Sequence, residues 1–142
     1  MIRWAARTDV GKKREHNEDN LLNLPDVGLF LVADGVGGRA SGEVASAMCV
    51  ETFADQGAVL SARLSAYADT RTIDARNAVL TELDSICQLA TRRIYEAAET
   101  QGKKGMTTTA VAVAIAGGTA FVVHVGDSRS YLIRDGEIRQ LT

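Results

Sequence analysis

Apolar and polar positions follow two different rhythms along this chain, and its most compact apolar run lies near the start. Residues 29–33 (Leu-Phe-Leu-Val-Ala) are uninterrupted and end at Asp34, which is followed by a glycine-rich turn over residues 35–38. Apolar runs of this length bounded by glycine are typical of fully buried strands. We therefore predict a strand over residues 28–34, paired as a hairpin with residues 20–24 around a turn at Pro25-Asp26.

Helical spacing marks the middle of the chain. Ser41 is a candidate N-cap, and Glu43 suits the positive end of a helix dipole. The apolar stripe of this helix consists of Val44, Ala45, Met48, Cys49 and Phe53, and Gly57 can end it. Residues 58–71 have helical spacing at only three positions, so their assignment stays open.

Residues 72–100 predict a second helix, which Gly102 and Gly105 close. Its predicted buried face is formed by Ile73, Leu80, Leu83, Cys87, Ala90 and Ile94. Strand spacing then returns: residues 107–116 alternate small and β-branched side chains, and Gly117-Gly118 predicts a tight hairpin to a return strand over residues 119–126.

A further hairpin is predicted at Asp135-Gly136, between residues 130–133 and 137–139. At the other end of the chain, residues 2–8 predict a weak strand, and residues 10–17 form a polar, basic loop. Strands in runs with grouped helices favour an α+β fold over a doubly wound sheet.

Composition excludes several classes of protein. The 142 residues suffice for one domain with a core, and 46% apolar and 24% charged residues are ordinary for a globular chain. A formal net charge of −2 offers no electrostatic support for nucleic-acid binding. No apolar stretch approaches the length of a membrane span, and the first residues lack a signal-peptide layout. Cys49 and Cys87 are expected to be reduced core residues of a cytoplasmic protein.

Acidic side chains stand where predicted strands begin or end. They are Glu18-Asp19, Asp34 beside Gly35, and Asp127. Carboxylate, carbonyl and water oxygens are the ligands of Mg²⁺ and Mn²⁺, so a few converging carboxylates suffice for a site. If Glu18 and Asp19 lie in a regular strand, they point to opposite faces, and only one of them can face such a site directly. Arg14, just upstream, offers a planar fork suited to phosphate.

Each of these features also has a structural interpretation. Glu18-Asp19 and Arg14 by themselves suit a solvated loop, and Asp127 suits a strand-ending turn. His124 alternates with apolar neighbours and is interpreted as structural, and His16 is not assigned a role. The functional hypothesis therefore rests on their convergence.

Four motifs occur in an order that resembles a known family. They are residues 14–20 (Arg-Glu-His-Asn-Glu-Asp-Asn), 32–38 (Val-Ala-Asp-Gly-Val-Gly-Gly), 105–110 (Gly-Met-Thr-Thr-Thr-Ala) and 125–129 (Val-Gly-Asp-Ser-Arg). Together they resemble the bacterial branch of the metal-dependent protein phosphatases, the type 2C serine/threonine phosphatases. The resemblance implies part of an α-β-β-α sandwich, in which antiparallel sheets are flanked by helix pairs, one pair being the two predicted helices.

The resemblance also implies a centre of two Mn²⁺ or Mg²⁺ ions, with a third, weaker site. Carried over by position, Asp34 bridges the two ions and the Gly35 carbonyl binds one, while Glu18 and Asp19 hold metal-bound water. Asp127 belongs to the third site. Arg14 binds the substrate phosphate, so that Asp34, Asp19 and Arg14 are the catalytic set. Residues 107–109 begin a core strand near the site.

Two departures from the family pattern change this expectation. Val36 stands where eukaryotic members carry a histidine, so the general acid is not identified. Catalytic domains of the family are also much longer and carry two further metal-binding aspartates beyond Thr142. We therefore interpret residues 1–142 as the amino-terminal part of one phosphatase catalytic domain, weakly active or inactive alone, whose exposed strand edges favour dimerisation.

On this interpretation the substrates are phosphoserine and phosphothreonine in proteins, and the partner is a serine/threonine kinase in signalling. One alternative is a pseudophosphatase or regulatory half-domain that binds a partner without catalysis. Another is a dinucleotide-binding fold, since residues 35–40 fit G-x-G-x-x-A. That fold requires parallel strands, whereas the predicted hairpins are antiparallel.

Overall fold

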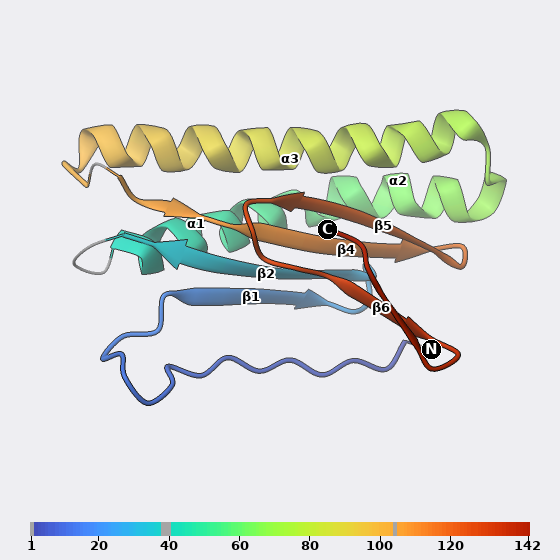
Figure 1. The fold of residues 1–142 in the computed structure, drawn as a ribbon. Helices are drawn as coiled ribbons and strands as arrows, with labels where there is room; N and C mark the ends of the chain where they lie inside the picture. Colours follow the sequence, from blue (N-terminus) through green and yellow to red (C-terminus); the bar gives the residue numbers. More distant parts are fainter. Residues whose placement is uncertain (1, 38–40, 104) are drawn as a thin grey trace.

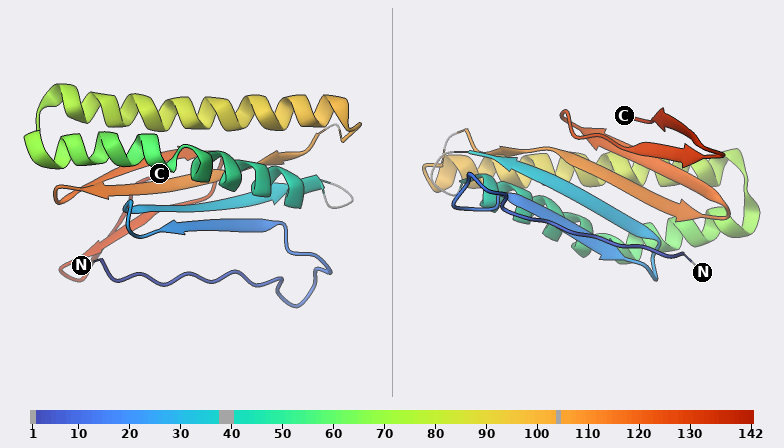
Figure 2. Two further views of the ribbon diagram at one scale, coloured as in Figure 1. Left: turned by 180° about the vertical axis from the view of Figure 1, so that it is seen from behind. Right: turned by 60° about the horizontal axis from the view of Figure 1, so that its bottom comes forward.

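A computed structural model describes residues 2–37, 41–103 and 105–142 of the chain. Helices α1 to α3 cover one face of an antiparallel sheet, and a separate hairpin lies on the other face (Figures 1 and 2). In chain order the elements are β1 (Asp19–Leu24), β2 (Leu29–Val36), α1 (Ser41–Asp55), α2 (Gly57–Thr70), α3 (Ile73–Thr100), β3 (Thr107–Thr108), β4 (Ala110–Ala116), β5 (Thr119–Val125), β6 (Tyr131–Arg134) and β7 (Glu137–Gln140). The α+β prediction is confirmed.

The main sheet has the strand order β1-β2-β4-β5, with β3 also paired to β2. Among the described residues, β6 and β7 pair only with each other. All of these pairs are antiparallel. Gly117 and Gly118 turn β4 into β5 with φ of 55° and 77°, the left-handed geometry of a two-residue hairpin. The antiparallel pairing of the described strands rules out the dinucleotide-binding alternative, which needs parallel βαβ units.

Strand β2 separates the two faces of the sheet. Leu29, Leu31 and Ala33 are at most 2% exposed and point toward the helices, whereas Val32 is 51% exposed on the opposite face. Period-two alternation places Asp34 on the same open face as Val32. The open face is therefore where β2 presents its carboxylate.

Three helices are present where two were predicted. Residues 58–71, left open from the sequence, belong to α2, which begins at Gly57 and ends at Arg71 in the left-handed conformation (φ 51°). Gly57 therefore starts a helix, and the expectation that it ends α1 is wrong, because α1 already stops at Asp55. Helix α3 begins after Thr72, whose hydroxyl accepts the Ala75 amide at 3.2 Å. Ser41, predicted as an N-cap, is the first residue of α1, and residue 40 lies outside the described residues.

The buried face of α3 differs from the predicted one at its start. Ile73 is 74% exposed and Leu80 is 39% exposed, whereas Val79 is fully buried. The first turn of α3 lies at the α2–α3 connection, at the far end of the helix layer (Figure 1). Ile73 is the first residue of this turn and does not join the core formed by the described residues. In this half of α3 the inward-packing positions are shifted by one residue from the prediction, since Val79 is buried where Leu80 was expected to be.

Both cysteines lie in the core, as predicted. Both thiols are free and buried, one on α1 and one on α3. Burial raises the pKa of Cys49 to about 12 and that of Cys87 to about 11. Within the described residues, none of the helices combines the length and apolar content that a membrane span requires.

The predicted strand over residues 2–8 is wrong. These residues join no ladder in the described structure, although they run along the sheet beside β1 (Figure 1). Trp4 packs against Phe30 of β2 with ring centroids 6.3 Å apart, so contact with the open face is made by a side chain. Although β1 is the outer strand of the main sheet, residues 2–8 form no backbone ladder with it in the described structure.

Phe53 lies at the centre of the helix–sheet core and is fully buried. Phe53→Ala is expected to destabilise the protein by about 3–5 kcal/mol, since it removes a large buried side chain and leaves a cavity. Chemical unfolding measures the change. Val59→Ala, at a 45% exposed position of α2, is the control and should change stability by less than about 1 kcal/mol. An equal loss in both variants would contradict this account of the core.

Candidate metal and phosphate site

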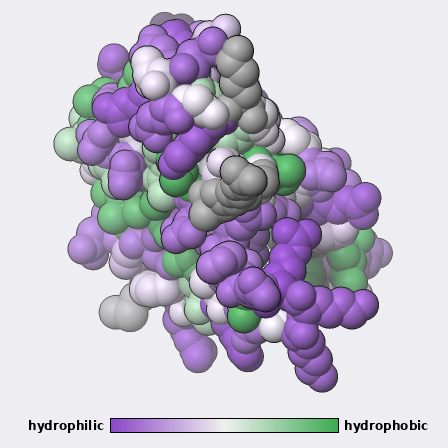
Figure 3. Space-filling model, turned by 90° about the vertical axis from the view of Figure 1, so that its left-hand side faces the viewer, coloured by the Kyte–Doolittle hydropathy of each residue, from purple (hydrophilic) through white to green (hydrophobic). Residues whose placement is uncertain are grey.

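Two of the predicted site carboxylates face each other across neighbouring strands. Asp19 begins β1 and Asp34 lies near the end of β2, and the two residues are directly paired in the antiparallel register. Directly paired residues have side chains on the same face, about 4.5–5.5 Å apart at Cβ. Residues distant in the sequence are thus brought together at one end of the sheet. Hydrophilic residues cover much of this end of the molecule (Figure 3).

The pKa of Asp34 identifies its neighbours. It is raised above its ordinary value, first by burial, then by the negative charge of Asp19 and a side-chain hydrogen bond with it, and then by Asp127. The Arg14 guanidinium acts in the opposite direction. Asp34 therefore lies in the field of two further carboxylates and one cation, all four of which are predicted site residues.

Glu18 immediately precedes β1, and its side chain packs toward α1. Its side chain is 15% exposed and its Oε2 lies 3.5 Å from Nη1 of Arg14, which is 74% exposed. A Cβ added to Gly42, in the first turn of α1, would lie 2.8 Å from Glu18 Oε1. Glu18 thus packs against the start of α1, where the helix dipole stabilises a negative charge.

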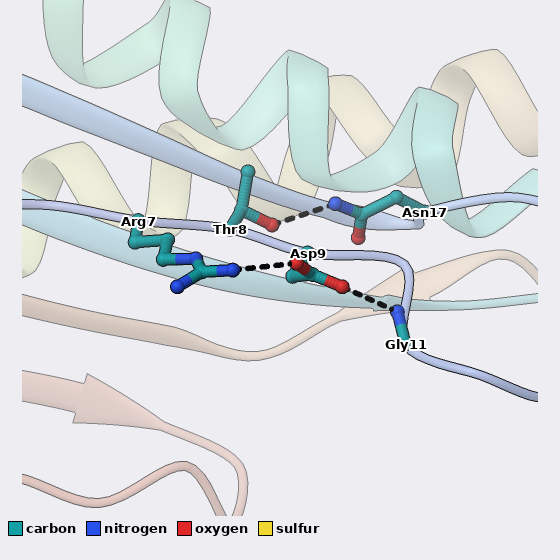
Figure 4. Close-up of polar contacts among 5 residues, drawn as sticks. All are labelled: Arg7, Thr8, Asp9, Gly11 and Asn17. Atoms are coloured by element: carbon teal, nitrogen blue, oxygen red, sulfur yellow. Dashed lines mark hydrogen bonds and ion pairs between the residues drawn. The ribbon is translucent and has the colours of Figure 1, made fainter.

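The loop that carries Arg14 is held by polar contacts at its base (Figure 4). Arg7 Nη2 and the Gly11 amide both donate to the Asp9 carboxylate at 2.9 Å, and Asn17 Nδ2 donates to Thr8 Oγ1 at 2.7 Å. The Gly11 amide, followed by Arg7, lowers the pKa of Asp9. A cavity of about 500 Å³ lies between this loop and the paired carboxylates; its lining includes Lys12, Lys13, Arg14, His16, Glu18, Asp19 and Asp34.

Thr109, which lies between β3 and β4, holds Asp34, a role that sequence reasoning missed. Its amide donates to the Asp34 carbonyl at 2.9 Å, and its hydroxyl accepts the Asp34 amide at 3.1 Å. The same hydroxyl lies 2.7 Å from Ser128 Oγ, next to Asp127. Thr109 therefore links two of the motifs that contain the acidic residues.

Thr109 also explains why residues 107–116 form two strands where one was predicted. The carbonyl of Thr109 accepts the Thr108 hydroxyl at 2.9 Å. The Asp34 amide donates to the Thr109 hydroxyl instead of to the Thr109 carbonyl. The register against β2 is the same for β3 and β4. The threonine run at residues 107–109 was the available signal, because threonine hydroxyls compete with the backbone for ladder hydrogen bonds.

Val36, the two histidines and the glycine turn are the other features noted in the sequence. Val36 is 57% exposed at the end of β2 and offers no proton donor. His16 lines the cavity, and His124 is exposed on β5 opposite Val111. Gly38, part of the predicted glycine turn, lies outside the described residues.

The donor set suits a hard divalent cation but is incomplete. Across residues 2–37, 41–103 and 105–142, no three His, Cys, Asp or Glu side chains gather closely enough to form a metal cluster. Asp127 influences Asp34 through its charge, which acts over longer distances than coordination does. The converging side chains offer oxygen ligands, as Mn²⁺ and Mg²⁺ require, and a cation would relieve the repulsion at Asp34.

Comparison with known proteins identifies the family. The family described as protein phosphatase 2C matches residues 11–142. The serine/threonine protein phosphatase PstP of Mycobacterium tuberculosis is 35% identical over 143 residues, covering 100% of this chain and 25% of the relative. The serine/threonine phosphatase stp of Listeria welshimeri is 36% identical over 140 residues, covering 96% of this chain and 52% of the relative.

Solved structures agree. The catalytic domain of PstP in complex with two manganese ions superposes with a TM-score of 0.78 at 36% identity, covering 99% of this chain and 54% of that one. The chain spans about half the length of the Listeria relative. Since the family match extends from residue 11 to the last residue, and the paired carboxylates lie within it, the chain belongs to the protein phosphatase 2C family.

Proposed function

We propose that this chain is the amino-terminal part of a metal-dependent protein serine/threonine phosphatase, which hydrolyses phosphoserine and phosphothreonine in proteins. The observation that supports this most directly is the pairing of Asp19 with Asp34 across β1 and β2, within the charge field of Asp127 and Arg14. The family membership and the two manganese ions of the PstP structure support the same function.

The proposed ligands are those that the family resemblance implies. Asp34 and the Gly35 carbonyl would hold two Mn²⁺ or Mg²⁺ ions, with Glu18 and Asp19 acting through water. Asp127 would contribute to a third site. Such ions supply an activated water nucleophile and neutralise phosphate charge.

Arg14 binds the phosphate of the substrate. Its side chain is 74% exposed beside the cavity, so a phosphate can reach its planar fork. Glu18 Oε2 lies 3.5 Å from Nη1 of this guanidinium. Because Val36 has no proton to give, the leaving group must take its proton from another source.

A non-catalytic role as a regulatory half-domain is the second candidate. It is favoured by the lack of a three-ligand cluster among the described residues. The exposed β5 edge and the apolar open face would suit a binding partner or a second copy of the chain. On either proposal the protein acts in the cytoplasm in signalling, and as a phosphatase it opposes a serine/threonine kinase.

Manganese-dependent hydrolysis of p-nitrophenyl phosphate tests the proposal. We expect little or no turnover by residues 1–142 and clear Mn²⁺-dependent turnover by a form extended beyond Thr142 to the length of the relatives. Activity of the extended form that disappears on chelation supports the phosphatase. An extended form that binds Mn²⁺ without hydrolysis would favour the regulatory half-domain.

Arg14→Ala is expected to lower kcat/KM of the extended form about 10- to 100-fold, mainly through KM. This matches the contribution of a hydrogen bond to a charged group, about 1.5–3 kcal/mol. Steady-state kinetics with a phosphothreonine peptide measures it. Lys13→Ala, in the same loop, is the control. Equal effects of the two substitutions would mean that the loop contributes only general positive charge.

A further inference from the structure

Ser46 is a fully buried polar residue on α1 whose hydroxyl faces the acidic segment, Glu18-Asp19. It donates to the Glu18 carbonyl at 2.6 Å and lies 3.2 Å from the Glu43 carbonyl one turn earlier in its own helix. It also accepts the side-chain amide of Asn20 at 2.9 Å. A hydroxyl has one proton, so the shorter distance identifies Glu18 as its principal acceptor.

This geometry is unusual for a serine within a helix. Such a hydroxyl ordinarily bonds back to a carbonyl three or four residues earlier, here that of Glu43. Ser46 instead directs its proton across to the chain segment that enters β1. The hydrogen bond joins α1 to the acidic segment over 28 residues of sequence.

The Glu18 carbonyl is also bound from the other side. It accepts the Gly35 amide at 3.2 Å, and Gly35 follows Asp34 in β2. One carbonyl group therefore ties together α1, the residue before β1 and the end of β2. Asn20, on the other side of Asp19, is held by the same serine. Both residues that flank Asp19 are thus bound to Ser46, one through its carbonyl and the other through its side chain.

We propose that Ser46 and Asn20 are positioning residues, a buried clasp that sets Glu18 and Asp19 for divalent metal binding. The inference rests on the proposed metal site. Neither residue needs to touch the metal ion or the substrate. They act by holding the backbone on both sides of Asp19, in the way that groups behind metal ligands generally orient them.

Loss of the clasp should weaken metal binding more than it weakens the fold. Ser46→Ala leaves the Glu18 carbonyl bonded only to Gly35 and leaves the Asn20 amide without its partner. Supporting groups of this kind change metal affinity about 10- to 100-fold. We expect the Mn²⁺ dissociation constant of Ser46→Ala to rise at least tenfold, and Asn20→Ala to produce a smaller rise of the same sign.

Thr52 provides a matched control on the same helix. It is also fully buried, and its hydroxyl donates to the Met48 carbonyl at 2.7 Å and accepts from Arg93 at 3.2 Å, away from the acidic segment. Thr52→Val removes a buried hydroxyl from α1 as Ser46→Ala does. Its Mn²⁺ affinity should stay within about twofold of the parent, which corresponds to about 0.4 kcal/mol, while thermal stability falls in both variants.

The test is isothermal titration of Mn²⁺ into the form extended beyond Thr142, which serves as the parent protein, and into its three variants, with thermal unfolding of each in chelator. A selective loss of affinity in Ser46→Ala and Asn20→Ala supports the clasp. Unchanged affinity in both, or the same loss in Thr52→Val, overturns it. If Ser46→Ala does not fold, Asn20→Ala alone decides between these outcomes. A parent protein that binds no Mn²⁺ would instead refute the metal site on which the proposed function depends.

Discussion

Asp34→Asn is expected to abolish the stabilisation of the protein by Mn²⁺ and, at the same time, to make the metal-free protein more stable at neutral pH. The two effects have one cause. Asp34 lies in a partly desolvated position near two other carboxylates, and its pKa is raised. The negative charge that binds a cation is unfavourable when no cation is present. A neutral amide of the same shape removes both the repulsion and the metal ligand.

The pH dependence has a definite sign. Because the pKa of Asp34 in the folded protein is above its ordinary value of 3.8, the folded state retains a proton that the unfolded state has lost. The stability of the metal-free protein therefore falls as pH rises from 3.8 through the folded pKa. The advantage of Asp34→Asn should be present at pH 7 and absent at pH 3.

Thermal unfolding with and without Mn²⁺ measures both effects. A metal at 100 times its dissociation constant stabilises the protein by about 2.7 kcal/mol, which for a chain of this size is an increase in Tm of about 10 °C. Asp34→Asn should lose that increase, and activity of the extended form should fall at least about 100-fold. Asp69→Asn, at an exposed position of α2, is the control. A full response to Mn²⁺ in Asp34→Asn would refute its assignment as a ligand.

Gly35→Ala is expected to be among the most destabilising single substitutions in the chain. A Cβ at this position would lie 2.1 Å from the Gly42 carbonyl oxygen and 2.6 Å from that of Glu18. Both atoms belong to the backbone, so α1 and the acidic segment would have to move away from β2. The cost should exceed about 3 kcal/mol, the upper end of overpacking effects, and the metal site should be lost with it.

Chemical unfolding measures this loss, with Gly57→Ala as the control. A Cβ at Gly57 would meet only the end of the Leu24 side chain, at 3.3 Å, and Gly57 lies in the first turn of α2. Alanine there should change stability by no more than about 1 kcal/mol. A Gly35→Ala variant of normal stability would mean that α1 can shift away from β2 without cost, contrary to the packing described.

Both predictions concern the end of β2, where the hydrophobic pattern of the sequence was strong. The apolar run that ends at Asp34 predicted β2 and its acidic end, because a strand buried on one face and flanked by glycine has few other solutions. The glycines at residues 117–118 and 136 likewise predicted their hairpins, since left-handed backbone favours glycine.

Prediction failed where an element depends on a partner. Residues 2–8 have a strand-like pattern, yet they join no sheet. Ile73 has helical spacing with the core residues of α3 but projects beyond the apolar layer. The threonine run at residues 107–109 signals competition for ladder hydrogen bonds, but it does not specify that the Thr109 hydroxyl becomes the acceptor for the Asp34 amide. In each case the outcome is set by residues that are distant in the sequence.

By itself, the sequence determined the α+β class, the strand that ends in a carboxylate, and a set of acidic residues whose order resembles that of the phosphatases, because strand and helix periods and turn residues are local properties. Only the tertiary structure decided that Asp19 lies directly opposite Asp34, that Thr109 holds Asp34, and that Ser46 binds both residues that flank Asp19. Strand register and helix docking decide which distant hydrogen-bonding groups meet, and no local pattern specifies either of them.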